Sequence, residues 1–131
     1  MSKPAMNESD RDRTIDYIEF GATDIEATKR FYATCFGWKF TDYGPGYVAF
    51  EDGRLTGGFT TDSKPGGAPL VVLYANKLEE SLAAVKAQRG RIVREIFSFP
   101  GGRRFHFLDP NGNELALWSG TPRNRVEVIG S

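Results

Sequence analysis

The sequence predicts an α+β protein built from two similar halves, each with the order strand, helix and three strands. Hydrophobic residues follow strand-like and helix-like spacings in this order twice, and a segment rich in proline and glycine lies between the two copies. The predicted helices have equal lengths, because Ile25 and Gly37 bracket the first at the same separation as Leu78 and Gly90 bracket the second. The repeated order and the equal helices indicate two βαβββ modules.

The first half begins with a predicted strand at 15–22, in which side chains alternate between two faces. Thr23 or Asp24 is suited to cap the helix that follows, and Gly37 is suited to end it. Phe31, Tyr32, Cys35 and Phe36 recur at helical spacing, so they are expected to form a buried face of this helix, with Cys35 acting as a small hydrophobic residue. Three strands are predicted next, at 38–43, 47–51 and 55–61.

The second half repeats these elements after the linker. A strand is predicted at 70–75 and a helix at about 78–88, which Gly90 ends. Three further strands are predicted at 91–97, 103–108 and 114–118, the last two joined by a run of turn-forming residues. The expected domain organisation is a flexible leader (1–13), a single domain (14–119) and a tail (120–131). The domain consists of two modules, at about 14–61 and 70–119, which the linker 62–69 joins.

Composition narrows the classes of partner. The chain of 131 residues has 17 Lys and Arg and 17 Asp and Glu, so no overall field attracts nucleic acid or an anionic membrane. The single cysteine forms no internal disulfide, and no apolar run resembles a signal peptide or a membrane span. A cytoplasmic protein with a small, roughly neutral ligand is the expectation, without nucleic-acid or membrane partners.

Several short motifs occur in order over 15–118: Asp24, Phe31-Tyr32, Phe36-Gly37-Trp38, Asp109-Pro110-Asn111-Gly112-Asn113, Leu115 and Trp118. In their order and spacing they resemble the glyoxalase, bleomycin resistance and extradiol dioxygenase superfamily, also called the vicinal oxygen chelate fold. The resemblance implies that the two modules form a curled mixed sheet around a central cup-shaped cavity that holds a small molecule. It also implies a homodimer.

Metal-dependent members of this superfamily hold a divalent cation with two histidines and one or two glutamates. Matching the motifs places the two histidines at Tyr17 and Leu70, and the last glutamate at Ala116. The remaining position falls within 57–59, where neither a carboxylate nor an imidazole occurs. No metal is therefore expected at the usual positions, and no cofactor is expected, because these residue types are poor ligands for such ions.

A metal at a non-standard position is the one alternative. Glu19 shares a strand face with Tyr17, and Glu114 shares one with Ala116, each displaced by about 7 Å along its strand. With His106, the only histidine, these carboxylates would form a shifted site. The structural alternatives are that Glu19 pairs with Arg103 or Arg104 and that Glu114 only begins a strand. Strand alternation leaves open which face His106 occupies.

Three functions follow from these residues. The first is a metal-independent binding protein, whose ligand-binding residues would be Tyr17, Glu19, Tyr74, His106, Glu114 and Trp118 and whose ligand would be planar or cationic. The second is a lyase, isomerase or dioxygenase with the shifted metal site, or with Glu19 as a metal-free general base. The third is a structural or regulatory module that binds another protein.

Overall fold

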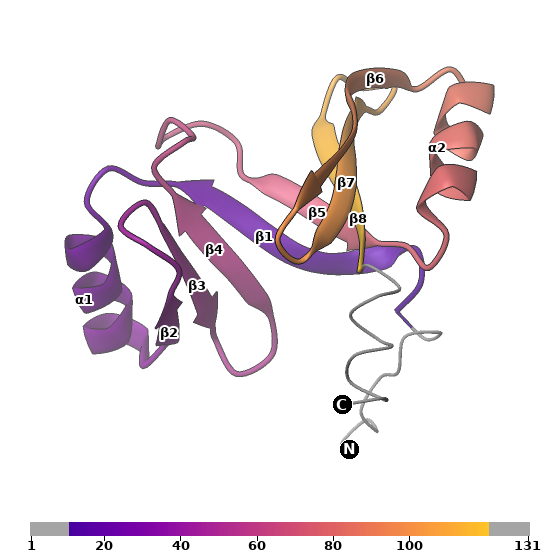
Figure 1. Ribbon diagram of the computed structural model, residues 1–131. Coiled ribbons are helices and arrows are strands. Elements are labelled where there is room, and N and C mark those ends of the chain that lie inside the picture. Colours follow the sequence, from indigo (N-terminus) through magenta and orange to yellow (C-terminus); the bar gives the residue numbers. More distant parts are fainter. Residues whose placement is uncertain (1–10, 121–131) are drawn as a thin grey trace, which may run out of the picture. The chain divides into compact units, whose positions relative to one another are not determined.

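The computed structural model describes residues 11–120, and these form two helices and eight strands (Figure 1). The chain divides into two compact units, one of residues 16–71 and one that joins residues 72–120 to residues 11–15. The predicted flexible leader lies mostly, and the tail almost entirely, outside the described residues. Neither described helix has the length and apolar content that crossing a membrane requires.

The first unit contains one helix and the four strands predicted for it (Figure 1). Its strands lie in the order β2-β3-β4-β1, with β1 and β4 parallel and the other neighbouring pairs antiparallel. The elements are β1 (Thr14–Gly21, most of it in this unit), α1 (Ile25–Phe36), β2 (Lys39–Asp42), β3 (Tyr47–Glu51) and β4 (Thr56–Thr60).

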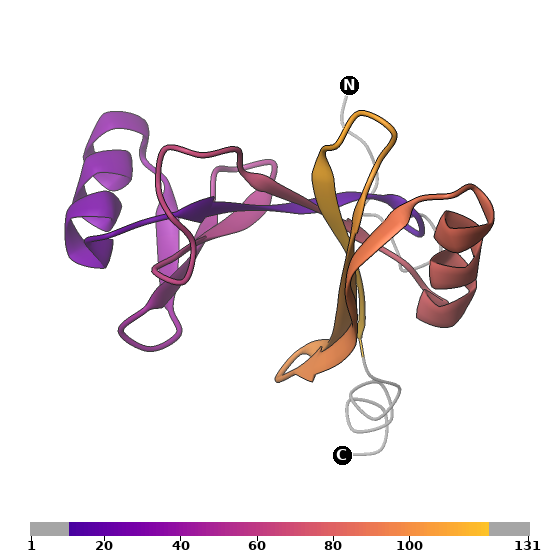
Figure 2. The same cartoon turned by 90° about the horizontal axis from the view of Figure 1, so that it is seen from above.

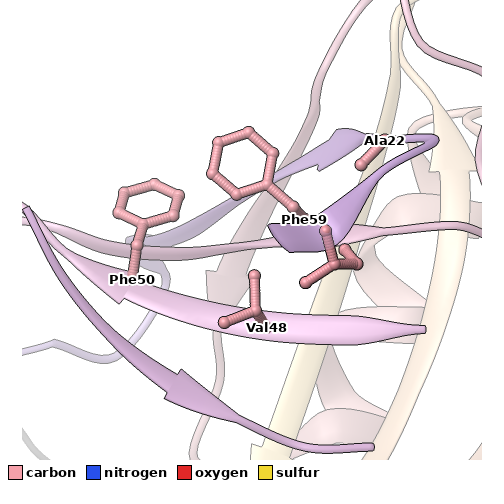
Figure 3. Close-up of a cluster of buried hydrophobic side chains, with 5 residues drawn as sticks. Ala22, Val48, Phe50 and Phe59 are labelled. Carbon is pink, nitrogen blue, oxygen red and sulfur yellow. The ribbon is translucent and has the colours of Figure 1, made fainter. Parts of the chain in front are cut away.

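Helix α1 covers one face of this sheet. The Asp24 carboxylate accepts a hydrogen bond from the Ala27 backbone N–H at 2.9 Å, which confirms one of the two predicted caps. Gly37 ends the helix with φ 74°, a left-handed conformation that glycine adopts without strain. The buried residues between helix and sheet are Ala22, Ile25, Val48, Phe50 and Phe59, four of which Figure 3 labels.

The expected buried face of α1 is partly wrong. Tyr32 packs against the core, but Phe31 and Phe36 are 55% and 64% exposed, and Cys35 is exposed. With 3.6 residues per turn, the helix directs Phe31 and Cys35 away from the side that Tyr32 presents to the sheet. The Phe31 and Phe36 rings instead pack around Tyr32, with centroids at 5.1 and 6.1 Å.

The second unit repeats this plan with its own helix. Its strands lie in the order β5-β8-β7-β6, and the β6–β7 and β7–β8 pairs are antiparallel. The turns at the two ends of β7 therefore lie at opposite ends of the strands (Figure 2). The elements are β5 (Leu70–Tyr74, most of it in this unit), α2 (Leu78–Ala87), β6 (Arg91–Phe99), β7 (Gly102–Leu108) and β8 (Glu114–Gly120).

Helix α2 covers one face of the second sheet. Phe105 and Leu117 are buried beneath Leu78, and Phe107 packs against the same cluster. Residues 11–13 meet the end of β5, where the Arg13 N–H donates to the Tyr74 carbonyl at 2.6 Å. The α+β class and the mixed strand directions are confirmed, whereas the curling of the sheets and the cup-shaped cavity stay predictions.

Candidate functional site

The face of the first sheet opposite α1 carries three polar side chains from two strands. Because successive strand residues point to opposite faces, the packing of Phe20 and Phe50 against α1 places Tyr17, Glu19 and Tyr47 on the other face. The two hydroxyl oxygens of Tyr17 and Tyr47 lie 2.6 Å apart, and the Tyr47 hydroxyl donates to Glu19 Oε2 at 2.9 Å. The Tyr17 hydroxyl therefore donates to Tyr47, whose single proton is already given to Glu19.

Gly58 of β4 leaves the room that these phenols occupy. It pairs with Glu19 on one side and with Ala49 on the other, so the strand that carries it runs between β1 and β3. A Cβ at this position would overlap the Tyr47 hydroxyl and lie 2.7 Å from the Tyr17 hydroxyl oxygen. Any side chain at position 58 would thus displace the phenol pair.

Tyr47 is held in its neutral form. Burial is the largest cause, followed by the negative charge of Glu19 and the hydrogen bond with Tyr17, and together they raise the pKa of Tyr47 far above its usual range. A neutral phenol between a second phenol and a carboxylate is a hydrogen-bond donor to the carboxylate and an acceptor from the other phenol. The three groups form one continuous chain of hydrogen bonds.

The residues at the positions where the family resemblance places metal ligands do not fit a metal ion. The Tyr17 hydroxyl is bonded to Tyr47, and Gly58, on the same face, has no side chain. Leu70 and Ala116 have no ligating atom. Within residues 11–120, no three side chains of His, Cys, Asp or Glu gather closely enough to hold an ion. The expectation that the protein uses no cofactor stays a prediction.

The second sheet also has a face opposite its helix. Phe105 and Leu117 pack beneath α2, so their neighbours Arg104, His106 and Trp118 lie on the other face. Trp118 contacts the Tyr74 ring edge-on, with centroids 5.0 Å apart and an interplanar angle of 80°. Phe99 and Phe97 of β6 extend this row of rings, with centroids 6.1 Å from Trp118 and 5.8 Å from His106, respectively.

Three guanidinium groups lie over these rings. The Cζ atom of Arg11 is 3.9 Å from the Tyr74 ring centroid, and that of Arg94 is 3.8 Å from the Phe97 ring centroid. Arg104 lies 5.5 Å from the Phe97 ring. Such cation–π contacts cover the flat side of a guanidinium and leave its N–H edges to bond with acceptors. The face therefore combines aromatic surface with positive charge.

His106, which is buried, forms a hydrogen-bonded pair with the exposed Glu114 on this face. The histidine is 5% exposed, and its Nδ1 lies 2.9 Å from Glu114 Oε2. Because an ionised carboxylate only accepts, the hydrogen bond assigns the proton to Nδ1 when the imidazole is neutral. Burial is the main cause that lowers the pKa of His106, opposed by the Glu114 hydrogen bond and reinforced by the charges of Arg104 and Arg94.

The structure thus brings the predicted site residues together in three groups. Tyr17 and Glu19 meet through Tyr47 in the first unit, while Tyr74 meets Trp118 and His106 meets Glu114 in the second. Arg103 does not pair with Glu19, because its guanidinium donates to both carboxylate oxygens of Glu79, at 2.5 and 3.1 Å.

Several residues of these groups were not predicted from the sequence. Tyr47 begins a strand whose alternation with Val48 and Phe50 would have placed it opposite the core. For Arg94 and Phe97 no such signal exists, because the pairing of β6 with β7 shifts register on both sides of Arg94. Their common face with His106 depends on these irregularities.

The fold resembles that of many solved structures. Methylmalonyl-CoA epimerase from Mycobacterium tuberculosis shares 12% identity and a TM-score of 0.67, over 86% of this chain and 91% of that one. A glyoxalase/bleomycin resistance protein/dioxygenase superfamily member from Vibrio splendidus 12B01 shares 14% identity and a TM-score of 0.61, over 79% and 96% of the two chains. At such identities the similarity establishes the fold alone.

A longer protein also matches. The Mn(II)-bound glyoxalase from Novosphingobium aromaticivorans shares 22% identity and a TM-score of 0.62, over 83% of this chain but 39% of that one. A comparison with curated protein sequences found no significant match. The family model for the Glyoxalase/Bleomycin resistance protein/Dioxygenase superfamily matches residues 14–117. The chain therefore belongs to the Glyoxalase/Bleomycin resistance protein/Dioxygenase superfamily.

Proposed function

We propose that this protein binds a small, planar organic molecule with an anionic group, without the metal ion used by metal-dependent members of its superfamily. The observation that carries the proposal is the row of aromatic rings with guanidinium groups over them on the second sheet, formed by Tyr74, Trp118, Phe97, Phe99, Arg11, Arg94 and Arg104.

The chemistry of this face favours an anion over a cation. Aromatic side chains offer a large apolar surface with few rotatable bonds, which suits a flat ligand. Arg94 is exposed, and within the described residues its guanidinium lies over the Phe97 ring and forms no ion pair with a carboxylate. Its N–H groups are thus available to a ligand carboxylate. The cationic ligand considered from sequence is replaced by an anionic one for this reason.

The test uses fluorescence of Trp118. The chain has two tryptophans, so Trp38→Phe leaves Trp118 as the sole indole reporter. We expect 2-naphthoate to change this fluorescence saturably and a naphthylmethylammonium ion to bind at least tenfold more weakly. Arg94→Gln should weaken 2-naphthoate binding, whereas Arg91→Gln, an exposed arginine on the same strand, should not. Equal binding of both probes would contradict the proposed ligand charge.

A metal-free enzyme is the second candidate, favoured by the hydrogen-bond chain from Tyr17 through Tyr47 to Glu19. A carboxylate linked to two phenols is suited to accept a proton from a bound carbon acid. We would follow deuterium incorporation from solvent into hydroxyacetone by NMR. This candidate requires exchange that is lost in Glu19→Gln and kept in Glu51→Gln, while both variants stay folded. Absence of exchange by the wild-type protein above the buffer rate would reject this carbon-acid activity.

Metal binding is tested separately. The purified, tag-free protein is incubated with nickel, zinc, manganese or iron, desalted, and analysed for its metal content. We expect less than a tenth of an equivalent of each ion to be retained. Near-stoichiometric metal that is lost in Glu19→Gln or Glu114→Gln would support the shifted metal site instead and overturn metal-independent binding.

The proposed assembly is a homodimer, by analogy with superfamily members. Sedimentation velocity over a range of concentrations measures the mass of the species in solution. A single species at twice the 14.6 kDa of the chain is the expected result. A monomer at all concentrations would reject the dimer without affecting the ligand proposal.

A further inference from the structure

One ring nitrogen of His106 lacks a hydrogen-bond partner among the described residues. The Nδ1 atom is bonded to Glu114, but Nε2 is buried and has no hydrogen-bond partner within residues 11–120. A buried nitrogen lone pair without a donor loses its hydration and gains nothing in return. Such a group in a folded protein calls for an explanation, and a ligand that supplies the missing donor is one.

Glu114 determines which kind of ligand group the imidazole can receive. Because the carboxylate accepts the Nδ1 proton, the neutral ring presents Nε2 as an acceptor. Burial and the positive charges of Arg94 and Arg104 keep the ring neutral, and Glu114 alone among the facing groups favours its protonated form. Nε2 thus requires an O–H or N–H donor.

The surroundings of His106 are part of the ring row. The Phe97 ring lies 5.8 Å away at an interplanar angle of 30°, with Arg94 over it. Ala116 lies directly opposite His106 in the β7–β8 register, so the two residues share a face. The resemblance places a glutamate of the metal-dependent members at this strand position. Ala116 has only a methyl group, so the polar side chain next to it on this face is that of His106.

We propose that His106 Nε2 accepts a hydrogen bond from a hydroxyl or N–H group of the ligand, so that the site selects planar acids that also carry a donor. The inference rests on the proposed binding function and adds the group that determines specificity. The ligand carboxylate would meet Arg94, its ring would meet Phe97, and its donor would meet His106. The chemical class is a hydroxyaryl or N–H-bearing heteroaryl carboxylate.

The experiment compares three acids of similar size by calorimetry: 2-naphthoate, 6-hydroxy-2-naphthoate and 6-methoxy-2-naphthoate. The wild-type protein should bind the hydroxy acid at least tenfold more tightly than the methoxy acid. His106→Phe should abolish this preference while it keeps binding of 2-naphthoate. Glu114→Ala should reduce the preference, and Glu95→Ala, which removes an exposed carboxylate of β6, should leave it unchanged.

A measurement on the wild-type protein avoids dependence on how the variants fold. His106 is the only histidine, so its two ring nitrogens give one pair of ¹⁵N resonances. We expect the Nδ1–H tautomer without ligand, and a shift of the Nε2 resonance with the hydroxy acid that the methoxy acid does not cause.

The outcomes separate the two proposals. Binding of 2-naphthoate without discrimination between hydroxy and methoxy acids would overturn the role of His106 and leave the proposed function standing. An Nε2 that carries the proton in the free protein would do the same. Failure of all three acids to bind would overturn both.

Discussion

The hydroxyl oxygens of Tyr17 and Tyr47 lie 2.6 Å apart, although thirty positions separate these residues in the chain. Tyr47 in turn donates to Glu19, and Gly58 between their strands has no side chain that would keep the phenols apart. Tyr17 is the residue at which the family resemblance places a histidine of the metal-dependent members. In this structure it is part of a hydrogen-bonded cluster of two phenols and a carboxylate.

The first prediction concerns the ionisation of Tyr47. Because its pKa is raised by burial and by Glu19, Tyr47 should remain protonated between about pH 9 and 11, where exposed tyrosines ionise. Tyr47→Phe should leave the absorbance change of phenolate formation over this range unaltered. A reduction by one residue in Tyr47→Phe would contradict the neutral state of Tyr47.

The raised pKa of Tyr47 also makes the free energy of unfolding depend on pH. Above pH 10 an unfolded chain loses the Tyr47 proton while the folded chain keeps it, so the free energy of unfolding falls as the pH rises. The contribution is at most about 1.4 kcal/mol per pH unit. Urea unfolding between about pH 10 and 11 should therefore show a smaller slope for Tyr47→Phe than for the wild type, and an unchanged slope would contradict this account.

Gly58 provides a prediction about packing. Gly58→Ala should lower the free energy of unfolding by about 1–3 kcal/mol, because the new methyl group would overlap the Tyr47 hydroxyl. In a Tyr47→Leu background the same substitution should cost less, since the overlapping phenol is gone. Gly67→Ala, in the linker, serves as the control, because the closest atom to its new Cβ is 3.9 Å away. Equal costs in both backgrounds would refute the steric explanation.

The local features of this site were predictable from the sequence, and its long-range pairings were not. Alternation along 15–22 predicts Tyr17 and Glu19 on one face, and the position before the helix predicts a cap at Thr23 or Asp24, of which the structure shows Asp24. The meeting of Tyr17 with Tyr47 depends on β4 lying between β1 and β3. Strand order is a tertiary property, which no local pattern determines.

His106, in the second unit, is another residue whose surroundings the local sequence does not determine. Phe105 and Phe107 flank it, so alternation alone gives two faces of which either is compatible with the sequence. The packing of Phe105 beneath α2 decides the question, because it directs His106 to the opposite face. The pairing of His106 with Glu114 then follows from the register of β7 with β8.

The two helices differ at their N-termini, which gives a prediction about capping. Asp24 caps α1 with its side chain, whereas Lys77 precedes α2 without a side-chain cap. Asp24→Ala should lower the free energy of unfolding by about 1 kcal/mol, and Lys77→Ser should raise it by up to about 1 kcal/mol. Urea unfolding measures both changes. Destabilisation by Lys77→Ser would show that its exposed ion pair with Glu80 contributes more than a cap does.

The pH dependence of stability near neutrality should depend mainly on His106. Burial lowers its pKa below 6.5, and the charges of Arg104 and Arg94 act in the same direction against Glu114. As the pH falls below 6.5, an unfolded chain takes up the imidazole proton while the folded chain does not, so the free energy of unfolding decreases. The loss is at most about 1.4 kcal/mol per pH unit and ends when the pH reaches the folded pKa.

The variant His106→Phe should remove this slope between about pH 7 and 5, whatever its own stability, because no other histidine is present. Three carboxylates have pKa values below their usual 3.8 (Asp52 and Asp109) or 4.5 (Glu79). They therefore affect the free energy of unfolding only at lower pH. Glu114→Ala should extend the slope to lower pH, since it removes the group that favours the imidazolium. A wild-type slope of opposite sign, with stability rising as the pH falls, would mean that the ion pair with Glu114 outweighs burial and that His106 is charged in the folded protein.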